Sequence, residues 1–453
     1  MANSIVTNKK TALVALRAAE SSNYLTVGSR KYFKDELKHR RNGQTYEFVV
    51  RDAGVYSRGL DISTAGASDI RERKVSKSLK VGNVSVNTSF IEPVTDLDWE
   101  KEVAIPQGKK MANGIVNDVI NGAKGKVMGD GTYVKDYDGD FGVPNTCFAG
   151  IGVGVLKDAQ NYLRSVSDED IYGFIHPMIN SRLSSTGKAF DSVDGAEPIF
   201  RKGLLGTLDG TSEIRTNQFL PLVNVSNALA TAAAGIDGIA YAKGYTSTIG
   251  GASYTDPNLA TITLNDGGSP IAVKIPKGFT IWVEGAYATD LVGDKTSELK
   301  AFTAVMDGTS NGVMIVKAID DEAWFYEGNK VICDANGQAF GSSASAAITA
   351  FNALVSAEGQ VKFLDAGNYF AGIFRLDGSM EFETLDEIDA SNADTTKGSN
   401  EGLTVFQNRA VDVMAGTNKT RWLTTYMGGI VEPRACATVI VKDACTNLVK
   451  VVQ

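Results

Sequence analysis

Residues 94–123, VTDLDWEKEVAIPQGKKMANGIVNDVINGA, decide the fold of this chain. In their second half, apolar residues recur with helical spacing and form one stripe: Ala112, Ile115, Val116, Val119, Ile120 and Ala123. The stripe predicts a long amphipathic helix within residues 93–128. Pro106 has no amide hydrogen and Gly108 has no side chain, so we expect the helix to kink or split there.

The segment before this helix, residues 44–91, has the alternation of extended strands. Apolar and polar residues alternate around Tyr46, Phe48 and Val50, and again around Val84, Val86, Thr88 and Phe90. Between them lies a polar stretch that ends in RERKVSKSLK, residues 71–80. We therefore predict two strands joined by a long, basic, projecting excursion, a feature that is uncommon unless it has a function.

The first 43 residues form a separate, short segment. Leu13, Leu16 and Ala19 recur at near-helical spacing, and the charged run KYFKDELKHRRNG follows them. A helix this short does not bury its own apolar face. It either docks on another part of the protein or is a frayed terminus, and the residues alone leave both readings open.

The part of the chain after the helix mixes helical and extended patterns. Within residues 129–221, GVGVLKDAQNYLRSV predicts a helix in its second half, and IYGFIHPMI predicts a strand that ends before Pro177. Residues 222–333 carry short β-rich runs, TITL, IAVKI, FTIWVEGAY, KAFTAVM, GVMIVKAI and KVIC, at the spacing of a sandwich or barrel. They predict a separate β domain.

Helical spacing returns at residues 344–357, through Ala347, Ile348, Phe351, Leu354 and Val355. The β-rich segments NYFAGIFRL, LTVFQNRAVDVM, KTRWLTTYM and ACATVIV follow. An acidic linker, TLDEIDASNADTTKGSNEG, interrupts these segments at residues 384–402.

Composition and charge exclude several classes of protein. The 453 residues exceed one ordinary core, so two or three domains are expected. The net charge of −8, from 45 basic and 53 acidic residues, disfavours holding DNA phosphates as the main role. No run of about 18 apolar residues indicates a membrane span, and the start of the chain lacks the pattern of a signal peptide. The four cysteines are scattered and indicate neither zinc nor a disulfide framework.

Catalytic and metal-binding patterns are also weak. The two histidines are His39, in a charged run, and His176, before a proline, and no GxSxG motif is present. The run KDYDGD, residues 135–140, alternates carboxylates but lacks the Gly and Glu spacing of a calcium loop, so a solvated acidic turn is favoured. No phosphate-binding loop occurs, and we expect no cofactor.

The order of these pieces resembles the major capsid (coat) proteins of tailed bacteriophages, the Hong Kong 97-like superfamily. Three passages carry the resemblance: residues 94–123, SSASAAITAFNALVSAEG at 342–359, and TRWLTTYMGGIVEPRACATVIV at 420–441. The inserted β region resembles the telokin-like I-domain of the P-twenty-two-type coat proteins. The departure is Pro106 with Gly108, which puts an unbroken spine helix in doubt.

The resemblance implies an α+β capsid fold with five parts. These are an N-terminal arm (1–43), an extended E-loop (44–91), a P-domain with the spine helix (92–128 and 403–453), an A-domain (129–221 and 334–402), and an inserted all-β I-domain (222–333). The predicted I-domain has large apolar side chains for a hydrophobic core of its own, at Trp282, Phe302 and Trp324.

The function implied is structural, with no enzymatic activity. Many copies would form the pentamers and hexamers of an icosahedral head, assembled in the host cytoplasm with a scaffolding protein and a portal protein. The head encloses double-stranded DNA without reading its sequence, and no membrane is involved. Two rival classes stay open: another phage structural protein such as a tail tube or adhesin, and a carbohydrate-active hydrolase with a β insertion.

Two stretches are candidates for contacts between subunits. The basic stretch holds Arg71, Arg73, Lys74 and Lys77, whose like charges favour an acidic partner on a neighbour. The stretch AKGYTSTIGGASYTDPN, residues 242–258, resembles in position the long D-loop of related I-domains and contains Lys243 and Asp256. The alternatives are a solvated loop for the first stretch and a disordered surface loop for the second.

Overall fold

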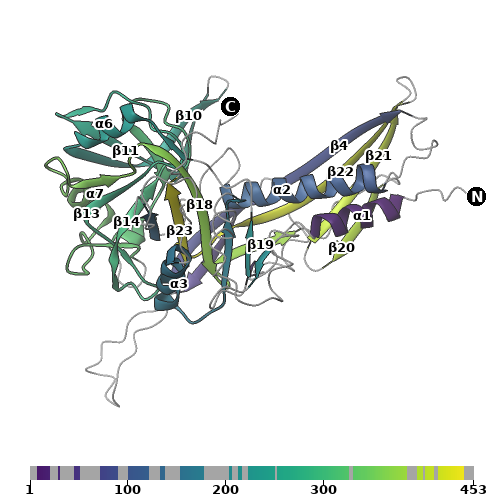
Figure 1. Ribbon diagram of the computed structural model, residues 1–453, viewed down its shortest axis with the longest axis horizontal. Helices are drawn as coiled ribbons and strands as arrows, with labels where there is room; N and C mark the ends of the chain where they lie inside the picture. Colours follow the sequence, from purple (N-terminus) through teal and green to yellow (C-terminus); the bar gives the residue numbers. More distant parts are fainter. Residues whose placement is uncertain are drawn as a thin grey trace, which may run out of the picture. The chain divides into compact units, whose positions relative to one another are not determined.

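The computed structural model of this chain has a mixed α+β architecture of two compact units, each built from segments that are distant in sequence (Figure 1). Unit 1 comprises Met1–Phe48, Val75–Ile120 and Met380–Val431, and unit 2 comprises Val49–Lys74, Asn121–Ser379 and Glu432–Gln453. The structure describes residues 8–20, 29–30, 45–51, 72–89, 100–121, 133–137, 154–177, 204–206, 213–216, 223–249, 252–325, 330–384, 395–400, 403–412 and 417–442.

Unit 1 is a six-stranded sheet with two helices packed on it. Its strands are β1 (Ser29–Arg30), β4 (Lys80–Ser89), β19 (Met380–Thr384), β20 (Thr395–Asn400), β21 (Leu403–Asp412) and β22 (Thr417–Ile430). The order is β1-β19-β22-β21-β20, and β4 also pairs with β22, antiparallel from Ser89↔Thr417 to Lys80↔Tyr426. Trp422, Phe406 and Met427 are among the buried residues of this sheet.

The predicted long helix is confirmed as a π-helical turn, η2 (Glu100–Ala104), followed directly by α2 (Ile105–Asn121). The change of helix type falls just before Pro106, because proline cannot donate the hydrogen bond that would continue the preceding turn. Ala112, Ile115 and Val116 of the predicted stripe are buried, and a side chain added at Gly82 or Gly428 of the sheet would meet Ile115 or Val119. The stripe therefore faces the sheet.

The N-terminal stretch forms α1 (Asn8–Glu20), which packs on η2, β20 and β21 within unit 1. This favours the docked reading over the frayed one. The predicted stripe was partly wrong: Leu13 is 37% exposed, and the buried face is centred on Ala12, Ala15, Leu16 and Ala19, with Ala18 beside it. Four residues at this spacing share one face of the helix, and Leu13 lies off that face.

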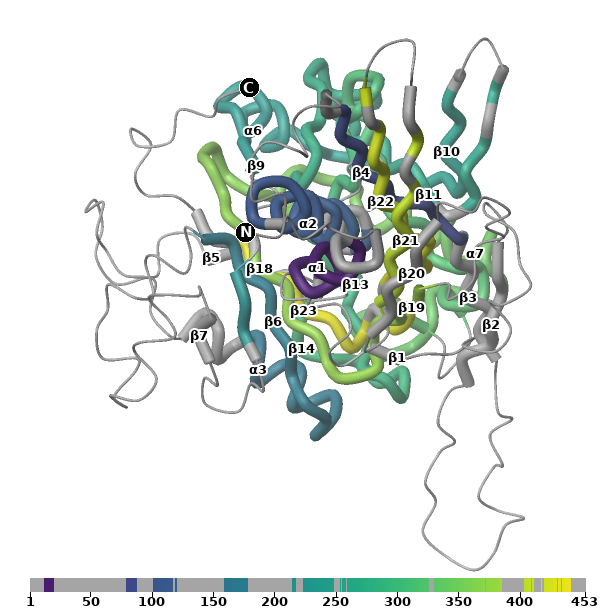
Figure 2. Tube along the Cα trace, turned by 90° about the vertical axis from the view of Figure 1, so that its right-hand side faces the viewer, coloured from purple at the N-terminus to yellow at the C-terminus, as the bar shows by residue number. Residues whose placement is uncertain are grey.

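Small residues allow α1 and α2 to approach closely. A Cβ atom at Gly108 would overlap the carbonyl oxygen of Ala15, with the Ala15 Cα only 3.1 Å away. The views in Figures 1 and 2 both place α1 alongside α2. Gly108 is thus required by helix packing, whereas the sequence alone indicates only a helix breaker at this position.

Two further strands, β2 (Thr45–Arg51) and β3 (Glu72–Ser78), form a two-stranded sheet. This corrects the prediction for the basic stretch: residues 72–78 lie in a strand and do not belong to the excursion itself. The β-branched residue Val75 favours an extended backbone, and β2 is the strand with which β3 pairs. The excursion at residues 52–71 lies outside the described part of the chain.

Unit 2 contains a seven-stranded mixed sheet. Its strands are β5 (Tyr133–Tyr137), β6 (Ile171–Ile175), β7 (Leu204–Gly206), β8 (Glu213–Thr216), β9 (Val223–Val225), β18 (Gly367–Leu376) and β23 (Cys436–Lys442). The order is β5-β23-β18-β6-β8-β7, with β9 on β18, and helix α3 (Gly154–Val166) packs on β18 and β23. The predicted helix and the strand before Pro177 are confirmed, whereas the expected acidic turn is wrong in part, since Asp136 lies within β5.

The β-rich region of unit 2 consists of two four-stranded sheets around one core. One sheet has β10 (Gly238–Ile249), β11 (Ala252–Asp266), β12 (Ser269–Pro270) and β15 (Val313–Lys317); the other has β13 (Thr280–Thr289), β14 (Lys295–Thr303), β16 (Ile332–Cys333) and β17 (Val361–Phe363). The predicted run IAVKI is not a regular strand and makes only an isolated bridge at Lys274. Pro270 and Pro276 flank it and remove two ladder donors.

Three helical segments accompany these sheets: α6 (Asn227–Ala234), η3 (Asp321–Trp324) and α7 (Ala344–Asn352). Ser226 and Ser343 cap α6 and α7, their hydroxyl oxygens accepting from Leu229 N at 3.2 Å and Ala346 N at 3.4 Å. A further one-turn helix, η4 (Pro433–Ala435), precedes β23.

The core of the β-rich region is aromatic and extends past residue 333. Phe351 lies 5.3 Å from Phe302, 5.5 Å from Trp324 and 6.3 Å from Tyr241, measured between ring centroids. Ala347, Val355 and Leu364 belong to the same buried cluster. The five-part division at residues 222 and 333 stays a prediction, and the packing continues into α7 and β17.

The prediction of an acidic linker at residues 384–402 is wrong in part. Residues 395–400 form β20, which pairs with β21 from Thr395↔Asn408 to Asn400↔Leu403. Two successive threonines favour an extended backbone, and β21 provides a neighbouring strand with a buried face. Tertiary pairing therefore overrides the polar composition of this segment.

Candidate assembly interface

The stretch at residues 242–258 forms a long hairpin of β10 and β11, which run side by side in Figure 2. The structure thus replaces the alternative of a disordered loop with paired strands up to Ile249↔Ala252. The inner half is anchored in the core through Ile239, Tyr241, Ile262 and Leu264. The outer half is polar, and its hydroxyls pair across the strands, with Thr246 Oγ1 2.8 Å from Thr255 Oγ1.

An irregularity divides the hairpin. Lys243 pairs with Ala260 and Tyr245 pairs with Asp256, so three residues of β11 stand opposite one residue of β10. That residue, Gly244, has a φ of 85°, which glycine adopts without steric cost. Bulges increase the local twist and bend a hairpin. Beyond the bulge, Tyr245 packs against Leu259, Val305 and Ile315 and so holds the base of the outer half.

The two predicted contact residues of this hairpin lie close to the bulge. Lys243 forms an ion pair with Asp321 of the same chain, at 2.7 Å from Nζ to Oδ1. Its side chain is 34% exposed and that of Asp321 is 60% exposed, so the pair contributes only about 0–1 kcal/mol. Asp256 lies opposite Tyr245. Contact of either residue with a neighbouring subunit stays a prediction.

Three residues of the predicted basic stretch, Arg73, Lys74 and Lys77, lie on β3, and Arg71 lies outside the described residues. The strand places them in one two-stranded sheet with β2. Their role in contacts between subunits also stays a prediction.

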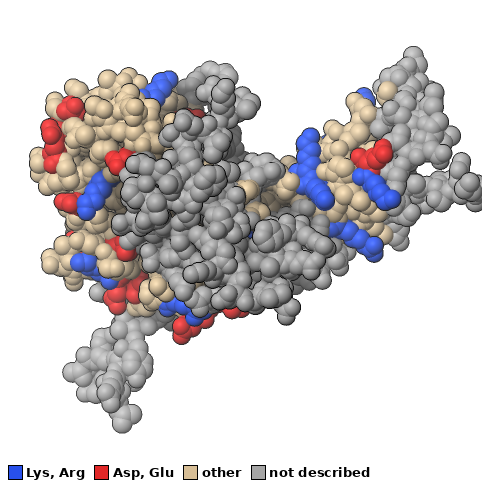
Figure 3. All heavy atoms as spheres, viewed as in Figure 1, with Lys and Arg blue, Asp and Glu red and all other residues tan. Residues whose placement is uncertain are grey.

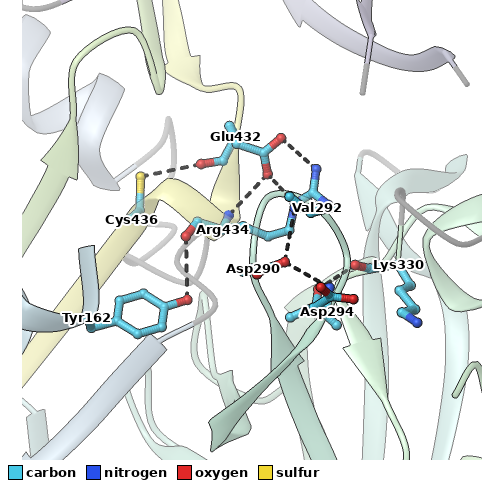
Figure 4. Close-up of polar contacts among 9 residues, drawn as sticks. Tyr162, Asp290, Val292, Asp294, Lys330, Glu432, Arg434 and Cys436 are labelled. Atoms are coloured by element: carbon cyan, nitrogen blue, oxygen red, sulfur yellow. Dashed lines mark hydrogen bonds and ion pairs between the residues drawn. The ribbon is translucent and has the colours of Figure 1, made fainter. Parts of the chain in front are cut away.

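Sequence reasoning missed a buried polar cluster in unit 2. Arg434 is 1% exposed and grips Glu432 through two parallel bonds, Nε to Oε1 at 2.8 Å and Nη2 to Oε2 at 3.0 Å (Figure 4). The amide of Glu432 donates to the Ser379 carbonyl at 3.1 Å. Ser379 and Glu432 are the unit 2 residues that directly precede and follow the unit 1 segment Met380–Val431. The local sequence EPRAC, residues 432–436, resembles an exposed turn and did not indicate that Arg434 is buried.

A second polar feature missed by sequence reasoning is a pair of matching turns. Asp290 Oδ1 accepts from the amides of Val292 at 3.0 Å and Asp294 at 2.8 Å (Figure 4), and Asp334 does the same for the residues two and four positions later. The Lys330 ammonium, buried, donates to the Gly337 carbonyl at 2.7 Å. Both turns are thereby held in a fixed conformation.

Shifted pKa values in the described residues have burial as their largest cause. Burial lowers the pKa of His176 to about 4 and that of Arg375 to about 10, and it raises the pKa of the Cys333 thiol to about 11. Burial likewise raises the pKa of Tyr241. His176 stacks on Phe370 with 4.9 Å between ring centroids. Core packing accounts for these groups, since no charged partner dominates any of the shifts.

The described residues contain neither a candidate metal site nor a candidate membrane-spanning helix. Within these ranges, no group of three or more His, Cys, Asp or Glu side chains could hold a metal ion. Among the helices in the same ranges, none is long and apolar enough to cross a membrane.

The chain is similar to solved phage capsid structures. The match to a structure from Mycobacterium phage Che8 covers 92% of this chain and 90% of the phage chain, at 10% identity and a TM-score of 0.39. The capsid structure of Cyanophage P-SCSP1u covers 92% and 89%, at 9% identity and a TM-score of 0.37. The acid-stable capsid structure of Helicobacter pylori bacteriophage KHP30 covers 93% and 89%, at 8% identity and a TM-score of 0.39. No protein-family profile and no curated protein matches the sequence.

Proposed function

We propose that this chain is the major capsid protein of a bacteriophage, with a Hong Kong 97-like fold and an inserted I-domain. In this proposal many copies assemble into pentamers and hexamers of an icosahedral head around double-stranded DNA. A scaffolding protein guides assembly, a portal occupies one vertex, and assembly takes place in the host cytoplasm. The chain itself catalyses no reaction.

The observation that carries the proposal is the construction of unit 1. A docked N-terminal helix, a long helix and a sheet of long strands come together from three distant segments of the chain. The order of these pieces is that of the N-arm, spine helix and P-domain strands. Much of unit 1 is therefore a frame of helix and long strands with a modest core, as suits a subunit that gains stability from its neighbours.

The same construction weighs against the rival classes. A tail-tube subunit would lack the long helix, whereas η2 and α2 together span Glu100–Asn121. A hydrolase needs two carboxylates across one cleft. The partly buried carboxylate of Glu432 is instead paired with the guanidinium of Arg434.

Charge supports enclosure of DNA without tight binding. On the face of unit 2 visible in Figure 3, basic and acidic side chains are interspersed among the described residues. With a net charge of −8, the chain repels a polyanion weakly on the whole. A duplex is then free to slide during packaging.

Contacts between subunits are assigned, within this proposal, to the hairpin of β10 and β11 and to the basic strand β3. The polar outer half of the hairpin, with paired Thr246 and Thr255, presents hydroxyls and backbone to a partner. Arg73 and Lys74 supply positive charge, so assembly is expected to weaken with salt.

The test is negative-stain microscopy of the purified full-length chain with and without its scaffold, beside assays for turnover. We expect capsomers or spherical shells. A monodisperse monomer at high concentration, with scaffold supplied, would overturn the proposal. Charge reversal at Arg73 and Lys74 in the same assay tests the contact assignment, which fails if shell yield stays unchanged.

A further inference from the structure

Strand β4 is the margin of the unit 1 sheet (Figure 1). All ten of its residues pair with β22, from Lys80 to Ser89. Among the described residues, no strand pairs with its other side. Alternate backbone N–H and C=O groups of an edge strand point away from its partner, and those of Val81–Ser89 meet no other described strand.

The side chains of β4 do nothing to protect this edge. After Lys80, the sequence VGNVSVNTS contains no charged residue and no proline. The pairing with β22 runs without a register shift. Val81, Asn83, Ser85 and Asn87 form its exposed face, and Val81 is 36% exposed. Natural sheets block open edges with charges, prolines, bulges or short strands.

Other described edge strands of comparable length carry such protection. The strands β2, β3, β14 and β20 each contain charged residues, and β10 has the irregularity at Gly244. The remaining sheet margins include strands of only two or three residues, such as β7, β12 and β16. β4 is the long edge strand in this group whose nine residues after Lys80 carry no charge, and such an edge is prone to pair with another chain.

We infer that the open edge of β4 is an interaction surface that pairs with β4 of a second copy of this chain. The two strands run antiparallel, so one sheet continues across both copies. The inference rests on the proposed function in one respect: a capsid brings many copies of the chain together.

Self-pairing suits the sequence of β4. An antiparallel register centred on Ser85 places Val84 opposite Val86 of the second copy, which continues the row of half-buried valines. It places Asn83 opposite Asn87 of the second copy and moves the two Lys80 residues to opposite ends. No like charges meet in this register.

The first experiment uses cysteine cross-linking of the full-length chain under mild oxidation. Ser85→Cys should yield covalent dimers, because Ser85 stands opposite itself. Asn83→Cys and Asn87→Cys should each link poorly alone but link to one another when the two proteins are mixed. Wild-type protein is the control for the native cysteines. Absence of a dimer for Ser85→Cys in associated protein overturns the inference.

The second experiment places a charge on the edge. Ser85 is exposed, so Ser85→Lys leaves unit 1 folded by circular dichroism but sets two ammonium groups against each other. We expect about a tenfold or greater loss of association by sedimentation. The matched variant Ser85→Thr, a good strand former, should associate as the wild type does.

The outcomes separate this inference from the capsid proposal. Shells formed normally by Ser85→Lys remove the edge pairing and leave the capsid role intact. Cross-linked Ser85→Cys dimers in a protein that never forms shells support the edge and remove the capsid role.

Discussion

Unit 1 and the β-rich region of unit 2 differ in the kind of residue that forms their buried contacts. Unit 1 joins segments that lie hundreds of residues apart, and its helices meet through small residues such as Ala15 and Gly108. The β-rich region is nearly continuous in sequence, from Val223 to Leu364, and is centred on large aromatic rings. Large rings bury much apolar area within one segment, whereas close-fitting small residues contribute little area and tolerate no added atom.

The largest expected effect concerns the boundary of the β-rich region. A fragment of residues 222–333 tests the predicted autonomous domain, and a fragment of residues 222–365 adds α7 and β17, with Phe351 and Leu364 of the core. We expect the longer fragment to be far more stable in thermal unfolding followed by circular dichroism. Equal stability of the two fragments would show that the aromatic core does not depend on α7.

The aromatic centre itself is tested by Phe351→Ala. Phe351 is fully buried among Phe302, Trp324 and Tyr241, so the variant should lose about 3–5 kcal/mol of unfolding free energy. The control is Thr349→Ala, an exposed position on the same helix, which should change stability little. Urea unfolding measures both, and a loss below ~1 kcal/mol for Phe351→Ala would contradict the role given to this ring.

The buried histidine of unit 2 predicts a dependence on pH. Burial lowers the pKa of His176 to about 4, below the value of about 6.5 in the unfolded chain, so the folded state binds fewer protons. Its contribution to stability is present in full above pH 6.5 and is lost as the pH falls toward 4. Between pH 7 and pH 5 we expect a loss of about 2 kcal/mol from this group.

The matching variant is His176→Gln, which removes the titration. Unfolding of the variant should depend less steeply on pH between 7 and 5 than that of the wild type. If the stability of the variant and of the wild type changed equally with pH, titration of His176 would not contribute to the pH dependence.

The close helix contact of unit 1 is tested by Gly108→Ala. The added methyl group would overlap the Ala15 carbonyl, so we expect a loss of about 1–3 kcal/mol and release of α1, seen as faster proteolysis at the N-terminus. Gly114→Ala on the same helix meets no atom within 4 Å and should stabilise by roughly 0.5–1 kcal/mol. Opposite signs for the two variants distinguish packing from helix propensity, and equal signs would remove the packing role.

Local pattern was sufficient for the elements whose own residues fix their environment. The stripe of α2 and the β-rich runs of β6, β13, β15 and β23 appear at their predicted places, since helical spacing and runs of β-branched and aromatic residues each favour one backbone conformation. The helix predicted within residues 344–357 is α7, which is capped by Ser343 and ends earlier, at Asn352. Boundaries were less accurate where polar residues continued into a strand, as at residues 395–400.

What only the tertiary structure decided depends on contacts between residues far apart in sequence. The hairpin of β10 and β11 looked like a loop because its outer half has almost no apolar residues, and the strand pairs supply the order instead. The pairing of buried Arg434 with Glu432 and the demand for glycine at position 108 were not visible in the sequence. A sequence states which groups a residue carries, but burial and steric fit depend on what the folded chain places beside it.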